Sequence, residues 1–386
     1  MTTWEQIRLI ISVLLGIGIS ILSFSVFFLV VFFFSDFLLL ILLFIFYISI
    51  IYFLVKWNID KSNKKYFSLG ISVLCLIIAA INIAYINYIQ TIPQLIETET
   101  DIYKYRPFNE DSILALPEKE TNYKITENMP VLDGATALYP VYAAFVNAVY
   151  PKDKYNPQNS IVLCSRTANA YINLLEGNAD IIFCARPSEE QKEKFAEKEL
   201  DIKFVPIGKE AFVFFVNKKN SINNLNIEDI QNIYSGKIKN WKYFGGKNKK
   251  IIAYQRPNDS GSQTALKNIM KNIPLIKPHR EDVSGGMGQM INRVASYRNF
   301  DNAIGYSFLH YTVKMANNDL IKLLSINNVY PQKTTIENNS YPFIDSFYAI
   351  YIEKENMNTN IKPFIEWILS NEGRELIEKS GYVAIN

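Results

Sequence analysis

One segment of the sequence, at 256–264, combines a guanidinium group with hydroxyl groups and a glycine. It reads Arg-Pro-Asn-Asp-Ser-Gly-Ser-Gln-Thr, follows an apolar segment and opens a helical pattern. Arg256 stands four residues before Ser260-Gly261-Ser262, so its guanidinium fork can converge with hydroxyl and amide donors on one oxyanion. An arginine in a surface salt bridge is the alternative interpretation. We predict that this segment binds an anion.

Two further segments offer similar chemistry before a helical pattern. The first, at 133–138, reads Asp-Gly-Ala-Thr-Ala-Leu, in which Gly134 lets the chain turn and small residues let backbone N–H groups approach a ligand. The second is Ser165-Arg166-Thr167, between a predicted strand and a predicted helix. Serine and threonine also cap helices, so each segment alone is weak evidence. The prediction of a site rests on three loops with the same chemistry.

A fourth segment, Ser-Gly-Gly-Met-Gly at 284–288, precedes a helical pattern but follows no clear strand. A dinucleotide-binding turn needs such a strand, so we interpret this segment as a loop at the cleft. Ser260 has no identifiable histidine base, and the sequence contains no Gly-x-Ser-x-Gly turn. The two histidines, His279 and His310, are too few and too isolated for a zinc site. We therefore expect no enzyme activity, no metal and no cofactor.

The elements that must position these loops alternate along the chain from residue 127. The pattern predicts strands at 160–164, 179–185, 211–217 and 250–255, and helices at 136–150, 167–177 and 227–236. Buried strands separated by helices indicate an α/β fold with parallel sheets, in which ligands bind at the carboxyl ends of the strands. Roughly 260 residues are too many for one compact sheet layer, so we expect two lobes.

The composition argues against a nucleic-acid partner. The net charge is +3, from 40 basic and 37 acidic residues, and no basic stripe of the kind that such proteins show follows residue 90. Of the three cysteines, Cys75 lies in an apolar segment, and Cys164 and Cys184 lie in predicted buried strands. The last two are interpreted as unreactive thiols, with a disulfide between neighbouring strands as the alternative.

Three segments without charged residues precede residue 90, at 9–35, 37–55 and 67–85. Each approaches or exceeds the length of about 20 residues that spans a bilayer as a helix. A cleaved signal peptide has a single, shorter apolar stretch, so we expect three retained transmembrane helices.

The loop at 56–65 carries four lysines and one aspartate, and the positive-inside rule places such a loop in the cytoplasm. We therefore expect a multi-pass anchor in the cell membrane at 1–90, a polar linker or lead-in at 91–126 and an extracytoplasmic domain at 127–386.

Several segments of that domain together resemble one family. The segment at 133–140 is similar to the first ligand loop of the phosphate-binding proteins of ABC importers, and Arg256 with Ser260-Gly261-Ser262 resembles their Arg-x-x-x-Ser-Gly-(Ser/Thr) loop. Further similar segments are 227–241, 302–308 and 361–385. The resemblance covers 127–386 and implies a two-lobed fold of the type II periplasmic-binding-protein kind.

In such a fold the ligand lies between the lobes, and strands here at 211–217 and 347–353 cross the hinge. We expect lobe 1 at about 127–211 and 350–386, and lobe 2 at about 218–346. The resemblance assigns ligand contacts to the Thr136 hydroxyl and the Ala137 amide, to a hydroxyl of Ser165 or Thr167, and to Arg256, Ser260, Gly261 and Ser262.

The sequence departs from this family after the strand at 179–185. Well-known members have an aspartate there that accepts the proton of hydrogen phosphate, whereas this chain has Ala185. An acceptor at that position disfavours a fully ionised anion such as sulfate. The departure predicts a weaker preference for phosphate over sulfate.

The resemblance implies a membrane-anchored, extracytoplasmic solute-binding protein that takes phosphate or a similar oxyanion and delivers it to an ABC permease. The alternative is a surface sensor or adhesion module that uses the same fold to regulate a membrane partner. Three retained spans favour the alternative somewhat, because delivery to a permease needs only a tether.

Overall fold

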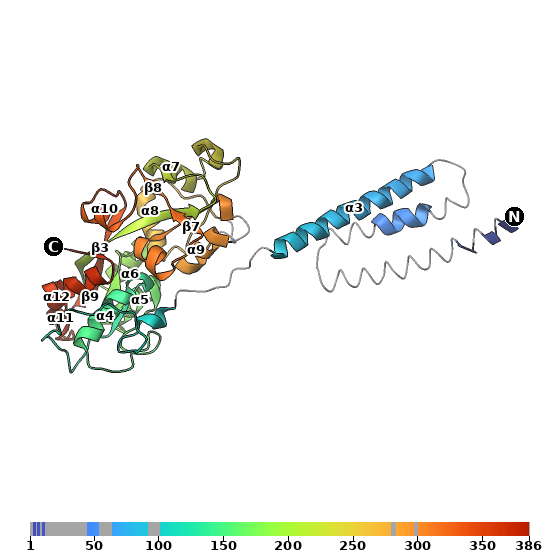
Figure 1. The fold of residues 1–386 in the computed structure, drawn as a ribbon. Coiled ribbons are helices and arrows are strands. Elements are labelled where there is room, and N and C mark those ends of the chain that lie inside the picture. Colours follow the sequence, from blue (N-terminus) through green and yellow to red (C-terminus); the bar gives the residue numbers. More distant parts are fainter. Residues whose placement is uncertain are drawn as a thin grey trace. The chain divides into compact units, whose positions relative to one another are not determined.

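The structure is a computed structural model, and it describes residues 3–4, 6–7, 10–11, 45–53, 64–91, 101–278, 283–296 and 300–385. The chain forms two compact units, Met1–Pro93 and Gln94–Asn386 (Figure 1). Outside the described residues lie His279, most of the predicted apolar segments 9–35 and 37–55, and most of the basic loop 56–65.

In the first unit, helix α3 (Lys64–Thr91) contains the predicted apolar segment 67–85. The Oγ atom of Ser72 in this helix lies 2.7 Å from that of Ser49, so the two buried hydroxyl groups satisfy each other. In the part of the chain that the structure describes, no helix is both long and apolar enough to cross a membrane. The described residues therefore do not support the three predicted transmembrane helices.

The second unit is organised around one long strand, β3 (Asp201–Asn217). Up to Ala211, β3 pairs antiparallel with β9 (Ile344–Glu353). Beyond Ala211 it pairs with β6 (Ala303–Phe308) and β7 (Ile321–Leu323). One continuous strand thus passes from one sheet region to another, and it begins ten residues before the predicted crossing strand at 211–217.

The strand order of the larger sheet is β1-β2-β9-β3-β6-β5. Parallel pairs join β1 (Leu132–Gly134) to β2 (Ile181–Cys184), and β5 (Ile252–Ala253) to β6. The remaining strands are β10 (Val383–Ala384), which pairs with β3, and β4 (Asn224–Leu225) and β8 (Ser325–Ile326), which pair with each other. The sheets are mixed rather than parallel as predicted, because β3 and β9 run antiparallel to each other and to their neighbours.

Helices pack on both halves of this unit. Those of lobe 1 are α4 (Tyr139–Val149), α5 (Arg166–Glu176), α6 (Glu189–Glu197), α11 (Ile361–Leu369) and α12 (Asn371–Lys379). Those of lobe 2 are α7 (Ile227–Tyr234), α8 (Gly261–Met270), α9 (Met287–Ser296) and α10 (Lys333–Glu337). Short helical turns are Ile102–Tyr105, Thr136–Leu138, Trp241–Phe244, Phe300–Asn302 and Tyr311–Met315. In Figure 1, α4, α11 and α12 lie at the opposite end of the unit from α7.

Each lobe has its own hydrophobic core. In lobe 1, Tyr142 of α4 stacks on Phe183 of β2 with 5.0 Å between ring centroids. In lobe 2, the ring centroids of Phe214 of β3 and Tyr306 of β6 lie 6.2 Å apart. Burial of a large apolar side chain contributes about 1.5–3 kcal/mol, so each lobe is stabilised by its own packing.

Residues 101–126, part of the segment predicted as a polar linker or lead-in, pack on lobe 1. Tyr105 and Ile125 are buried in the lobe 1 core. Thr121 accepts a hydrogen bond of 3.0 Å from the indole Nε1 of Trp367. The polar composition of this segment suggested a linker because its few apolar side chains, which anchor it, show no periodicity.

The predicted strand at 160–164 contains only an isolated bridge, between Val162 and Leu132. Val162 is fully buried and its neighbours are partly buried, and Leu132 exchanges two backbone hydrogen bonds with Ile161 and Leu163. Cys164 and Cys184 are free thiols, which excludes the disulfide alternative for this structure. Burial raises the pKa of Cys164 to about 12, as expected for an unreactive thiol.

Candidate anion-binding cleft

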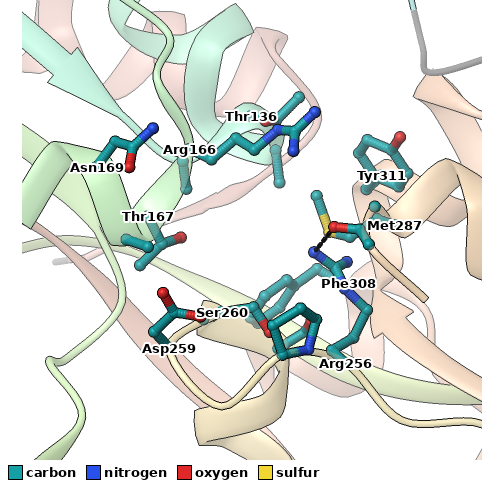
Figure 2. Close-up of a pocket in the computed structure, with 18 of the residues that line it drawn as sticks. Thr136, Arg166, Thr167, Asn169, Arg256, Asp259, Ser260, Met287, Phe308 and Tyr311 are labelled. Carbon is teal, nitrogen blue, oxygen red and sulfur yellow. Dashed lines mark hydrogen bonds between the residues drawn. The ribbon is translucent and has the colours of Figure 1, made fainter. Parts of the chain in front are cut away.

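A cavity of about 330 Å³ is lined by loops of both lobes (Figure 2). Lobe 1 contributes residues 135–137 and 165–169. Lobe 2 contributes residues 256–257, 259–262 and 285–287, with Phe308 and Tyr311. The three predicted anion loops and the glycine-rich loop at 284–288 therefore meet at one place. The eight residues assigned to the ligand by resemblance all line this cavity.

The two lobe 1 loops are held together by the buried carboxylate of Asp133, the middle residue of β1. It accepts hydrogen bonds from the backbone N–H groups of Gly134 (2.7 Å) and Ser165 (2.8 Å) and from the amide of Asn173 (2.7 Å). Several donors to one carboxylate satisfy its charge without water. Asp133 thus fixes the position of the second loop relative to the first.

Gly134 is required where β1 meets β2. A Cβ atom on Gly134 would lie 2.6 Å from the Phe183 carbonyl oxygen and 2.9 Å from the Tyr142 ring. No other residue fits there without moving the strand that leads into the first loop.

The same network distinguishes the two candidate hydroxyl groups of the second loop. The Ser165 hydroxyl donates its proton to Asp133, so it has no proton to offer an anion. Thr167, the second residue of α5, lines the cavity next to the lobe 2 loop. We therefore assign the donor role in this loop to Thr167 and a positioning role to Ser165.

In lobe 2, Arg256 is buried at the cavity, with 8% of its surface exposed. Its backbone N–H donates to the Gln263 side-chain oxygen and the Tyr306 hydroxyl, each at 2.9 Å. Its guanidinium Nη2 donates to the Gly285 carbonyl at 3.2 Å (Figure 2). Ser260 caps α8, accepting from the Gln263 N–H. The loop is therefore fixed at both ends, with the guanidinium group directed at the cavity.

The two lobes already touch where Thr167 meets Gly261. A Cβ atom on Gly261 would lie 3.0 Å from the Thr167 Oγ1 atom and 3.4 Å from its Cγ2 atom. A glycine at the first position of α8 thus lets the lobe 1 loop approach the lobe 2 loop.

We expect Gly261→Ala to weaken anion binding by about 1–3 kcal/mol, the usual cost of inserting a methyl group into a closely packed contact. The stability of lobe 2 should not fall, because alanine is favoured over glycine in a helix by about 0.5–1 kcal/mol. Titration calorimetry and thermal unfolding of the full chain measure both quantities. Asn268→Ala is the matched control, because Asn268 is an exposed residue of the same helix and does not line the cavity. Equal binding by the two variants would contradict the proposed contact.

The cavity also contains side chains that the sequence analysis does not assign. Arg166 and Asn169 project from α5, and Asp259 lies in the Arg256 loop (Figure 2). The charged residues Arg166 and Asp259 stood within the predicted loops and could have been found by their chemistry. Met287 lies in the glycine-rich segment that the sequence analysis placed at the cleft. Phe308 and Tyr311 gave no signal, because they look like core residues in the sequence.

Ala185 does not line the cavity, and neither does the arginine that follows it. The Tyr171 hydroxyl donates to the Ala185 carbonyl at 2.6 Å. The Arg186 side chain donates to the Tyr348 hydroxyl at 3.0 Å, with its guanidinium carbon 5.0 Å from that ring's centroid. Arg186 therefore belongs to a cation–π contact outside the cavity. The carboxylate among the lining residues is that of Asp259.

Two lobes with separate cores, a strand that passes between them and a polar cavity lined from both define the class of two-lobed solute-binding proteins. A family model described as a PBP superfamily domain matches residues 129–372, more than half of the chain. The chain belongs to this family.

Relatives of the chain bear related names. A phosphate-binding protein PstS of Borreliella burgdorferi is 28% identical over 183 residues, which are 46% of this chain and 63% of that protein. The match thus spans less than two thirds of the Borreliella protein. A phosphate-binding protein PstS of Staphylococcus aureus is 26% identical over 263 residues, 65% of this chain and 77% of that protein.

A solved structure from Clostridium perfringens, described as a phosphate ABC transporter substrate-binding protein with bound phosphate, is similar with a TM-score of 0.51. It is 24% identical, and the match covers 68% of this chain and 100% of that one. At this level of identity the similarity supports the fold, which is the two-lobed α/β fold predicted from the sequence.

Proposed function

We propose that this chain binds phosphate, or a closely similar oxyanion, between its two lobes and passes it to an ABC importer. The observation that carries the proposal is the convergence of Arg256 and the small, hydroxyl-bearing loops of both lobes on one cavity. The names of the relatives supply the ligand class, and the ABC importer is what the resemblance of the binding loops implies.

The physical basis is a hinge that closes on its ligand. Open lobes admit the anion, and donors from both lobes then bridge it and favour the closed state. A hydrogen bond to a charged group contributes about 1.5–3 kcal/mol net. Several such bonds reach the roughly 8 kcal/mol that corresponds to micromolar binding.

Thermal unfolding of the full chain in detergent tests this proposal. Phosphate at about one hundred times its dissociation constant should stabilise the native state by about 2.7 kcal/mol. Chloride at equal ionic strength is the control for salt effects. If neither phosphate nor sulfate stabilises the chain, the proposed function is wrong.

We expect phosphate to be preferred over sulfate by less than about a thousandfold, or roughly 4 kcal/mol. The reason is that Ala185 supplies no proton acceptor and lies outside the cavity, whereas an acceptor would reject the fully ionised sulfate. Competition between the two anions, followed by calorimetry, measures the ratio. A larger preference would mean that another group accepts the proton of phosphate. Asp259 is the carboxylate that lines the cavity, so Asp259→Asn would then abolish the preference for phosphate.

We also propose that the N-terminal apolar segments anchor the chain in the cell membrane with the binding domain outside. The support is the sequence: three uncharged segments and a lysine-rich loop at 56–65. Reporter fusions after residue 95 should be active only outside the cytoplasm. Activity of the same fusions in the cytoplasm would overturn the extracytoplasmic assignment.

A further inference from the structure

Arg166 is a cationic residue of lobe 1 that lines the same cavity as Arg256 of lobe 2. In Figure 2 its side chain extends from the start of α5 toward Thr136, across the cavity from Arg256. Neither the sequence pattern nor the resemblance assigns a role to it. Its position nonetheless places a second guanidinium group on the wall opposite the first.

Two features of the local backbone disfavour an arginine at this position. Arg166 has a φ of +74°, in the left-handed region that favours glycine. Among the non-glycine residues with positive φ in the described part of the chain, Arg166 is the one that lines the cavity. It is also the first residue of α5, where the helix dipole disfavours a cation. Two local costs at one residue are typical of a site kept for function.

A pair of guanidinium groups on opposite walls also bears on lobe closure. Two like charges on opposite walls raise the electrostatic cost of bringing those walls together. A bound dianion lies between them, reverses the sign of the interaction and favours the closed state. A singly charged anion would compensate only one of the two.

We propose that Arg166 is a second anion-binding residue, and that the ligand is a dianionic oxyanion held by guanidinium groups from both lobes. This inference rests on the proposed anion-binding function and adds the charge class of the ligand. The acidic residue on the cavity wall, Asp259, leaves the two arginines in excess.

The test uses the full chain in detergent with Arg166→Gly. This variant removes the guanidinium group and relieves the positive φ, so its thermal stability should equal or exceed that of the unchanged protein. Its dissociation constant for phosphate should rise roughly 10- to 100-fold, the loss expected for one charge-assisted contact. A residue with a merely structural role would change stability without this loss of affinity.

Lys192→Ala is the matched control for the change in charge. Lys192 is an exposed residue of α6 in the same lobe, paired with Glu189 at 2.6 Å, and it does not line the cavity. Its loss should change the dissociation constant by less than about threefold, since exposed ion pairs contribute little.

Sulfate and perchlorate test the charge class of the ligand. Both anions are tetrahedral, but sulfate carries two negative charges and perchlorate carries one. The unchanged protein should prefer sulfate, and Arg166→Gly should reduce that preference by roughly tenfold. If Arg166→Gly binds phosphate within about threefold of the unchanged protein, while Arg256→Ala loses binding, the inference is wrong and the proposed function stands. An unchanged sulfate-to-perchlorate ratio would equally refute the inference. If the unchanged protein binds neither phosphate nor sulfate, the proposed function itself is wrong.

Discussion

Replacing Arg256 by alanine is expected to weaken phosphate binding by about 2–5 kcal/mol, the usual cost of removing one partner of a buried, hydrogen-bonded charge pair. Arg256 is nearly buried at the cavity, so water cannot replace its guanidinium group. Arg256→Lys should recover only part of the loss, because an ammonium group supplies a point charge and no bidentate fork.

The fold should tolerate the Arg256 variants. The backbone N–H of Arg256, not its side chain, makes the bonds to Gln263 and Tyr306 that fix the loop. The side-chain bond to the Gly285 carbonyl is long, at 3.2 Å. Calorimetry gives the affinity and chemical denaturation gives the stability. Normal phosphate binding by Arg256→Ala would end the assignment of this loop as the anion site.

The second large effect concerns Glu210, next to the point where β3 changes its pairing from β9 to β6. Glu210 is buried, and burial raises the pKa of its carboxyl group to about 8 despite hydrogen bonds from backbone N–H groups, including that of His310 at 3.1 Å. Among the described residues its Oε2 atom has no hydrogen-bond partner. A buried carboxylate with few partners is costly to ionise.

The sign of the pH effect follows from proton linkage. In the unfolded chain Glu210 loses its proton near its ordinary pKa of 4.5, whereas in the folded chain it keeps the proton up to about pH 8. The stabilising contribution of protonated Glu210 is therefore complete below about pH 4.5 and is lost as the pH rises toward 8. His310 does not interfere over the upper part of this range, because burial lowers its pKa to about 4 and it stays neutral.

We expect Glu210→Gln to remove this dependence and to raise the free energy of unfolding at about pH 8 by a few kcal/mol. The upper limit is about 1.4 kcal/mol for each unit of pKa shift. Denaturant unfolding between about pH 6.5 and pH 9 measures the slope. Glu189→Gln, at an exposed position of α6 in the same lobe, is the control and should leave the slope unchanged. A Glu210→Gln protein with the same pH dependence as the unchanged chain would contradict a protonated Glu210.

The binding loops could be predicted because their chemistry is local. Arg256 with its Ser-Gly-Ser motif, and the small residues after β1, follow apolar segments and open helices within a few positions. The role of Asp133 could not be found in this way, because it depends on Ser165 and Asn173, which lie far along the chain. Only the packing of β1 against the second loop brings these groups together.

The sheet topology was harder to predict for the same reason. Apolar strands do not show the direction of their partners, so antiparallel pairing of β3 with β9, whose residues are far apart in sequence, left no local signal. The segment at 160–164 has a strand-like composition but forms only an isolated bridge, between Val162 and Leu132. Arg166 lies inside one of the predicted loops but was not assigned to the site, and its positive φ is visible only in the structure.

Calorimetric titration of the full chain with phosphate, with Arg256→Ala in parallel, tests the central claim most directly. The account predicts that each chain binds one phosphate with a dissociation constant that is micromolar or lower. It also predicts that the variant loses roughly 30-fold or more in affinity. Saturable binding that is equal in the two proteins would place the anion elsewhere. An absence of heat with phosphate and with sulfate, in a chain that unfolds cooperatively, would contradict the account.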